Sequence, residues 1–177
     1  MGRNMEIKAR AADFAAQRVK AFELAGGPPE TIDQEDTFFG TKRGRLKLRA
    51  LSEGEGQLIY YERPDAQGPS ESRYIILPTR DPAELKGALS KALGISGVVR
   101  KHREVYHVAG TRVHLDTVEG LGEFIELEAV LGPGESPEDG RARVGEIRDA
   151  LGITAEDLIE KAYVDLLAEL DAPEDAS

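Results

Sequence analysis

The stretch NMEIKAR, residues 4–10, alternates polar and apolar residues over its whole length. Side chains of a β-strand point to opposite faces in turn, so Asn4, Glu6, Lys8 and Arg10 are expected to share one face, with the apolar residues on the other. The polar face carries charges of both signs. Whether that face meets water or another charged surface decides what kind of sheet this strand belongs to.

Further stretches repeat this alternation of charged and aliphatic residues. Their charged faces hold Arg45, Lys47 and Arg49 in 45–49, Arg112, His114 and Asp116 in 112–116, and Glu126 and Glu128 in 124–128. Lys101 and Arg103 share a face near the start of another strand candidate, and Arg63 ends a further one. A one-sided antiparallel sheet with its charged face in water shows the same pattern, so this alternative stays open for each strand alone.

The chain as a whole predicts eight strands and few helices. The strand candidates, separated by glycine- and proline-containing turns, are 3–10, 32–39, 44–52, 57–63, 72–79, 98–109, 111–118 and 123–131. Cap and stop signals predict helices at 11–25, 81–93, 136–152 and, in a short form, from Thr154, with further turns at 163–170. We expect an α+β fold, an eight-stranded antiparallel β-barrel with helices packed outside, as a single domain over 1–170 with a disordered tail at 171–177.

The helices need apolar surface to cover, and the aliphatic strand faces supply it. If helices cover those faces, the charged faces turn toward one another inside the barrel. Buried charge is expensive unless it is paired or binds a ligand. A set of six or more cations with three or four carboxylates suits a polyphosphate with metal ions, because arginine and lysine hold phosphate oxygens and carboxylates hold hard divalent cations.

Composition excludes several other classes of protein. The 177 residues include 33 acidic and 23 basic side chains and no cysteine, so disulfides and thiolate sites are excluded. Residues 119–177 carry 17 acidic and 4 basic side chains, which argues against nucleic-acid binding. No apolar run approaches the roughly 20 residues of a membrane helix, and the N-terminus lacks the apolar stretch of a signal peptide. We therefore expect a cytoplasmic protein without a membrane partner.

The first strand resembles the E-x-E-x-K signature of the CYTH superfamily, which includes class IV adenylyl cyclases, thiamine triphosphatases and other triphosphate tunnel enzymes. Other stretches agree in order with that superfamily: DTFF at 36–39, GRLKLR at 44–49, KHR at 101–103, HLD at 114–116, GLGEFIELE at 120–128 and AYVDLL at 162–167. The resemblance covers about residues 4–167. The GRLKLR and GLGEFIELE stretches are most similar to the class IV cyclase branch.

The resemblance implies a closed triphosphate tunnel and a role for each charged residue inside it. Glu6, Glu126 and Glu128 would bind Mg²⁺ or Mn²⁺. The phosphates would lie against Lys8, Arg10, Lys47, Arg49, Arg63, Lys101, Arg103 and Arg112. Lys8 and Arg49 would also be catalytic, as would Asp116, either as a further ligand or general base. For Asp116 an ion pair with Arg112 or Arg103 is the alternative.

Four positions carry less weight. Asn4 stands where the signature has its first glutamate, so one metal position loses a negative charge. Arg45 and Arg73 are as consistent with exposed surface positions as with binding phosphate in the tunnel. His114 shares the tunnel face, but a lone histidine is more often structural.

Three functions stay open on the sequence. The first, favoured by the family branch, is conversion of ATP to cyclic AMP and pyrophosphate. The second is hydrolysis of thiamine triphosphate or inorganic triphosphate, and the third is binding of a phosphorylated ligand without turnover. The expected partner is a nucleoside or other triphosphate, and a homodimer is compatible with this interpretation.

Overall fold

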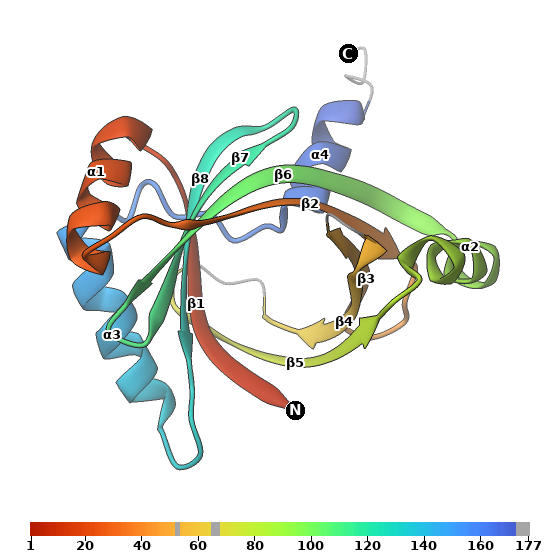
Figure 1. The fold of residues 1–177 in the computed structure, drawn as a ribbon, viewed down its shortest axis with the longest axis horizontal. Coiled ribbons are helices and arrows are strands. Elements are labelled where there is room, and N and C mark those ends of the chain that lie inside the picture. The colour runs from red at the N-terminus through yellow and green to blue at the C-terminus, as the bar shows by residue number, and fades with distance from the viewer. Residues whose placement is uncertain (52–53, 65–67, 173–177) are drawn as a thin grey trace, which may run out of the picture.

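The computed structural model describes residues 1–51, 54–64 and 68–172 and contains eight strands and four helices in those ranges (Figure 1). The strands are β1 (Gly2–Arg10), β2 (Glu30–Phe39), β3 (Arg45–Leu51), β4 (Gly56–Glu62), β5 (Ser70–Thr79), β6 (Ile95–Val108), β7 (Thr111–Val118) and β8 (Gly122–Val130). The helices are α1 (Phe14–Ala25), α2 (Pro82–Leu93), α3 (Pro137–Ala150) and α4 (Tyr163–Asp171).

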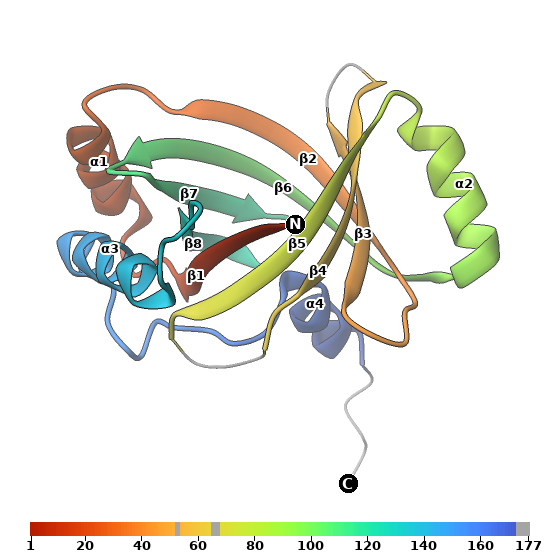
Figure 2. The ribbon, with the colours of Figure 1, turned by 90° about the horizontal axis from the view of Figure 1, so that it is seen from below.

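The strands form one closed barrel in the order β1-β5-β4-β3-β2-β6-β7-β8. Neighbouring strands are antiparallel, and β1 closes the barrel because it pairs with both β5 and β8. The predicted α+β barrel with helices outside is therefore confirmed. The views in Figures 1 and 2 place α1 and α3 together on one side of the barrel and α2 on the opposite side.

Local signals in the sequence set the helix ends. The Asp81 side chain accepts a hydrogen bond from the Glu84 backbone nitrogen at 2.9 Å, and Pro82 follows as the first helical residue. Ser136 and Asp139 form a reciprocal capping box at the start of α3. Gly26 ends α1 in a left-handed conformation with φ of 70°.

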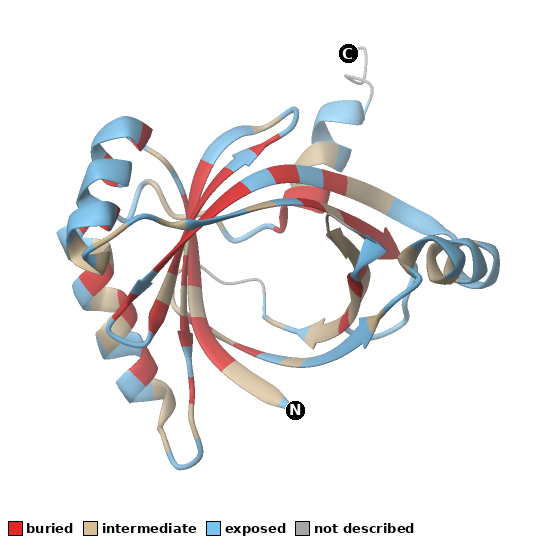
Figure 3. Cartoon of the chain, viewed as in Figure 1, coloured by how far each residue is buried: buried red, intermediate tan, exposed pale blue. Residues whose placement is uncertain are grey.

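The main hydrophobic core lies between one wall of the barrel and the helices α1 and α3 (Figure 3). Met5, Ile7 and Ala9 of β1 contribute to this core, which confirms that the aliphatic face of 4–10 points outward to helices. The helix α3 approaches β1 closely at Gly140, where a side chain's first carbon would come within 2.8 Å of the Cβ atom of Met5. The opposite face of β1 is left for the barrel interior.

One predicted helix is wrong. Residues from Thr154 form turns instead. The Asp157 carboxylate does accept hydrogen bonds from the backbone nitrogen and the hydroxyl of Thr154 at 2.8 Å, as at a helix start, but no helix follows. The segment then runs beside β1: the Arg10 nitrogen donates to the Asp157 carbonyl and the Ile159 nitrogen to the Lys8 carbonyl. Backbone bonds to the strand replace the expected helical ones.

Asp171, the first residue of the expected tail, is the last residue of α4. Residues 173–177 of that tail lie outside the described residues. Within the part of the chain that the structure describes, no helix combines the length and apolar character needed to span a bilayer.

Candidate functional site

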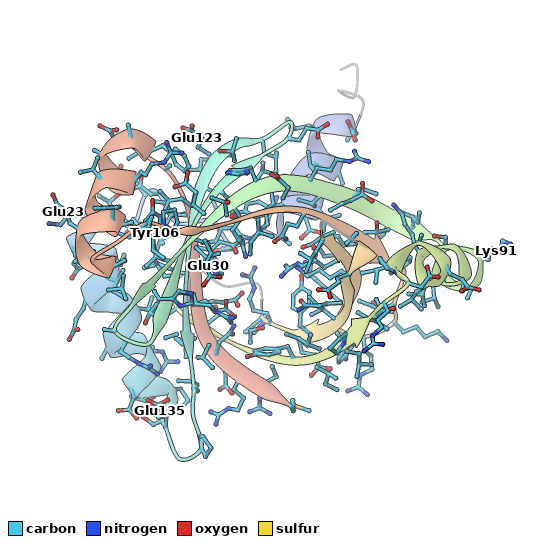
Figure 4. All side chains as sticks on the ribbon, in the orientation of Figure 1. Glu23, Glu30, Lys91, Tyr106, Glu123 and Glu135 are labelled. Carbon is cyan, nitrogen blue, oxygen red and sulfur yellow. The ribbon has the colours of Figure 1, made fainter. Side chains whose placement is uncertain are left out.

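A cavity of about 390 Å³ occupies the barrel and is lined by inward-facing side chains from all eight strands. Figure 4 shows that many side chains project into the ring of strands. Seven of the described lysines and arginines line it: Lys8, Lys47, Arg49, Arg63, Lys101, Arg103 and Arg112. Glu6, Glu126 and Glu128 line the same cavity. The structure thus brings together ten of the twelve residues that the sequence singled out as the site.

Three glutamates cluster on the wall formed by β1 and β8. Glu6 and Glu128 are directly opposite each other across the strand pair, and Glu126 is opposite Lys8. Burial raises the pKa of Glu6 above its ordinary value, and the negative charges of Glu128 and Glu126 raise it further against the opposing effect of Arg63. This wall therefore concentrates negative charge in a region shielded from water.

Each of these carboxylates has a cationic partner in the cavity. Arg63 Nη1 lies 2.9 Å from Glu6, Arg112 Nη2 lies 2.8 Å from Glu128, and Lys8 Nζ lies 3.2 Å from Glu126. Arg103 also reaches Glu126, at 2.5 Å. All three glutamates are therefore paired with cations of the same cavity.

Asp36 anchors two cations on the facing wall. Lys47 Nζ and Arg49 Nε lie 2.7 and 2.9 Å from its carboxylate oxygens. Burial alone would raise the pKa of Asp36, but Lys47 and Arg49 hold it well below its usual range. Burial lowers the pKa of Lys47 to about 8 even though Asp36 partly opposes this shift.

Asp116 lies behind the cavity surface and is fully buried. Its carboxylate accepts hydrogen bonds from Arg103 at 2.6 Å, Lys101 at 2.7 Å and the Tyr163 hydroxyl at 3.1 Å. Burial raises its pKa, but Arg103 and Lys101 outweigh burial and lower it to about 2. The geometry matches the ion-pair alternative with Arg103, whereas Arg112 pairs with Glu128 instead.

Arg10 does not join the cavity, although it shares the strand face of Lys8. It is exposed and its guanidinium stacks over the Phe124 ring at 5.2 Å from the centroid. The physical reason is position along the barrel: Arg10 ends β1, where the strand already pairs with the segment at Asp157. The expectation that Arg10 binds phosphate inside the tunnel is corrected accordingly.

The structure places Arg45, Arg73 and His114, the less certain positions, in three different surroundings. Arg45 makes a two-bond ion pair with Asp165 of α4, at 3.0 and 2.8 Å. Arg73 pairs with Glu71 and is largely exposed. His114 lies inside the cavity beside Glu126 and Glu128, with ring nitrogens 3.7 and 3.9 Å from their oxygens. Burial lowers the pKa of His114 to about 4, so the imidazole is neutral near pH 7.

Sequence reasoning missed two residues of the site, Asp36 and Tyr163. The alternation 32, 34, 36, 38 along β2 could have placed Asp36 inside, since Gln34 and Phe38 also line the cavity. Tyr163 gives no such signal because it starts a helix 47 residues beyond Asp116, its hydrogen-bond partner.

The donor set fits a hard divalent cation. Glu6, Glu126 and Glu128 offer carboxylate oxygens, and Asn4 adds a buried side-chain oxygen that has no hydrogen-bond partner among the described residues. Mg²⁺ and Mn²⁺ prefer such oxygen ligands. Among the described residues, no three histidine, aspartate or glutamate side chains already form a compact ligand group, because cations hold the carboxylates apart.

Residues 2–163 match the family model of the CYTH domain. The chain belongs to the CYTH domain family. A Methanocaldococcus jannaschii protein named "Putative adenylate cyclase" is 31% identical over 140 residues, which cover 75% of this chain and 80% of that protein. "Adenylate cyclase CyaB" of Aeromonas hydrophila is 26% identical over 173 residues, which cover 90% of this CYTH chain and 85% of that protein.

The solved structure of the PH1012 protein from Pyrococcus horikoshii has the same fold. It superposes with a TM-score of 0.81 over 92% of this chain and 98% of that chain, at 25% identity. The closed barrel described above is thus the CYTH triphosphate tunnel fold.

Proposed function

We propose that this CYTH protein binds ATP with Mg²⁺ or Mn²⁺ inside the barrel and converts it to cyclic AMP and pyrophosphate. The observation that carries the proposal is the convergence of seven cations and three glutamates on one cavity. The seven cations outnumber the three glutamates and Asp36 that line the same cavity, and enclosed charge without a partner is expensive. A triphosphate supplies the missing negative charge, and a divalent cation bound with it can take over the glutamates.

Binding would exchange the ion pairs of the empty cavity. The phosphate oxygens take over Lys8, Arg63, Arg103 and Arg112, which the glutamates hold in the unliganded protein. Arginine suits this role because its planar guanidinium binds two phosphate oxygens at once. Glu6, Glu126 and Glu128, released from those pairs, would then hold the cation together with the Asn4 side-chain oxygen. Lys47 and Lys101 complete the phosphate-binding set.

Glu6, Glu126, Glu128 and the Asn4 oxygen would hold a divalent cation whose positive charge would offset the negative charge that develops on the phosphates. In the proposed step the ribose 3′-oxygen bonds to the α-phosphorus, the bond from that phosphorus to the β-bridging oxygen breaks, and pyrophosphate leaves with the electron pair of that bond. The 3′-hydroxyl proton passes to solvent water. Lys8 and Arg49, on facing walls, would stabilise the departing pyrophosphate. Asp116 supports the step from behind by fixing Lys101 and Arg103.

The names of the two relatives favour cyclisation over hydrolysis, and this support is by resemblance alone. A decisive assay incubates the full chain with Mg²⁺ or Mn²⁺ and, separately, ATP, GTP, thiamine triphosphate or inorganic tripolyphosphate. We expect cyclic AMP and pyrophosphate from ATP in equal amounts, and none when a chelator is present. Release of phosphate without cyclic nucleotide would replace the cyclase proposal with a triphosphatase.

Binding without turnover is tested in the same samples by thermal unfolding. A ligand that binds only the folded state adds RT ln(1 + [L]/Kd), about 2.7 kcal/mol at a hundredfold excess over Kd. We expect tripolyphosphate to raise Tm by several degrees and phosphate or sulfate to raise it much less at matched ionic strength. Equal shifts from all three anions would contradict a triphosphate site altogether.

A further inference from the structure

Tyr163 reaches the barrel interior from outside the sheet. It is the first residue of α4, it is 5% exposed, and it lines the cavity with the preceding Ala162. The helix that carries it is fastened to the barrel by the two hydrogen bonds from Arg45 to Asp165. The ring is therefore held at a fixed place relative to the cavity wall.

Three groups of the site contact this tyrosine. Its ring face lies 4.0 Å from Lys8 Nζ and 4.9 Å from Lys101 Nζ, measured to the ring centroid. Its hydroxyl donates to Asp116 Oδ2 at 3.1 Å. The ring of Phe124 supports it from the side, with centroids 4.9 Å apart. Tyr163 thus contacts a lysine of β1, a lysine of β6 and the buried carboxylate of Asp116, which accepts hydrogen bonds from Lys101 and Arg103.

Lys8 above all needs such a neutral partner, because Lys101 keeps its hydrogen bond to Asp116 at 2.7 Å. Lysine carries its charge on a flexible stem, and Lys8 and Lys101 are 7% and 8% exposed, so little water fixes their ammonium groups. In the unliganded cavity, Lys8 is held by Glu126 at 3.2 Å. In the occupied site that we propose, Glu126 turns to the cation and no longer holds Lys8. An aromatic face attracts an ammonium group without neutralising the charge that phosphate needs.

The geometry points to Tyr163 as a positioning residue that holds the ammonium groups of Lys8 and Lys101 toward the phosphates when Glu126 is withdrawn. This inference rests on the proposed triphosphate site. We infer that the face of the Tyr163 ring positions the two lysines. The Tyr163 hydroxyl bonds to Asp116, and Asp116 keeps its hydrogen bonds from Arg103 and Lys101 if that hydroxyl is removed.

The test compares four variants of the full chain. Tyr163→Phe keeps the aromatic ring, whereas Tyr163→Leu and Tyr163→Met replace it with an aliphatic or thioether side chain. The test needs only one of the latter two variants to fold. Leu167→Ala is the matched control, because Leu167 packs against the same hydrophobic cluster as Tyr163 and is not among the residues that line the cavity. Affinity for inorganic tripolyphosphate is measured by calorimetry, and Tm is measured for each variant.

A second measurement needs no ligand. The ring current of Tyr163 shifts the NMR signals of the Lys8 and Lys101 side-chain methylene groups next to nitrogen, which Lys8→Arg and Lys101→Arg variants assign. We expect these shifts to persist in Tyr163→Phe and Leu167→Ala and to vanish in the variants without a ring.

We expect tripolyphosphate affinity to fall about tenfold in Tyr163→Leu or Tyr163→Met, and to stay within about twofold of the parent in Tyr163→Phe. Leu167→Ala should lower Tm and keep the affinity. Equal loss of affinity in Leu167→Ala and Tyr163→Leu would overturn the positioning role and leave a structural one. Failure of the parent protein to bind tripolyphosphate would sink the proposed function, and unshifted lysine signals in the parent would sink the inference independently.

Discussion

Glu6 and Glu128 face each other directly across β1 and β8 inside the cavity. Like charges at opposed strand positions destabilise a sheet, and here burial adds to the cost. Arg63 and Arg112 offset part of that cost from either side. A sheet that places two carboxylates together in this way is arranged for a cation that binds both.

The first prediction concerns that cation. Glu126→Gln should weaken Mn²⁺ binding at least tenfold and abolish turnover, because the amide has lost the charge that attracts a metal ion. Free Mn²⁺ is measured by electron paramagnetic resonance at a fixed tripolyphosphate concentration, and the Mn²⁺ held by tripolyphosphate alone is subtracted with a sample that contains no protein. Glu123→Gln is the control, since Glu123 is exposed near the start of the same strand. Unchanged Mn²⁺ binding by Glu126→Gln would contradict the metal assignment.

The second prediction concerns Asp36. Asp36→Asn removes the buried negative partner of Lys47 and Arg49 and leaves two partly buried cations side by side. Breaking one partner of a buried ion pair costs about 3–5 kcal/mol, and we expect a loss of that order in the free energy of unfolding by urea. Tripolyphosphate should restore more stability in this variant than in the parent, because the ligand replaces the missing charge.

Asp33→Asn provides the control for that experiment. Asp33 lies on the same strand, its side chain is 83% exposed and its partner is His102. Surface changes of this kind alter stability by less than about 0.5 kcal/mol. Similar losses in the two variants would show that the ion pairs of Asp36 carry no special weight.

The third prediction is a pH dependence set by Lys47. Its pKa falls from 10.5 to about 8 in the fold, so the unfolded chain binds more protons between these values. The free energy of unfolding without ligand should therefore gain from this group as pH rises through that window. Tripolyphosphate binding should weaken above pH 8, because binding must restore the proton.

Proton uptake is measured by calorimetry near pH 9 in two buffers that differ in ionisation enthalpy. Lys47→Arg keeps its charge throughout the range and should reduce the uptake. Identical binding enthalpies in both buffers for the parent protein would rule out this role for Lys47.

The fourth prediction separates two arginines that the sequence treats alike. Arg49→Gln removes a cavity cation and should weaken tripolyphosphate binding about tenfold or more, as expected for a charge-assisted hydrogen bond to phosphate. Arg10→Gln should leave that affinity within about twofold, since Arg10 stacks on Phe124 outside the cavity. Calorimetry on both variants decides, and a large loss in Arg10→Gln would place the ligand beyond the cavity described here.

The sequence predicts the barrel well because several strands, among them 4–10, 45–49, 112–116 and 124–128, carry a period-two pattern. Lys8, Lys47 and Arg103 could be placed on inner faces from alternation alone, and the helix caps at Asp81 and Ser136 follow equally local rules. These signals need only neighbouring residues, so they are visible without knowledge of the fold.

The rest depended on where strands end and on distant contacts. Alternation gives the face of Arg10 but not its depth along the barrel, which the pairing of β1 with the Asp157 segment determines. The helix expected from Thr154 does not form, and the backbone of this segment pairs with β1 instead. Tyr163 reaches the site through a helix docked by Arg45, a contact that spans 120 residues of sequence. No local pattern contains that information.

The double pairing of β1 has a consequence for the order in which the protein acquires its site. The first strand synthesised bonds to β8, so the ring cannot close until residues 122–130 have left the ribosome. Until then β1 exposes an unpaired edge together with Glu6 and Lys8. Contacts this distant in sequence form slowly, and open strand edges invite pairing with other chains. We therefore expect substitutions in β1 to lower the folding yield before they lower the stability of the folded barrel.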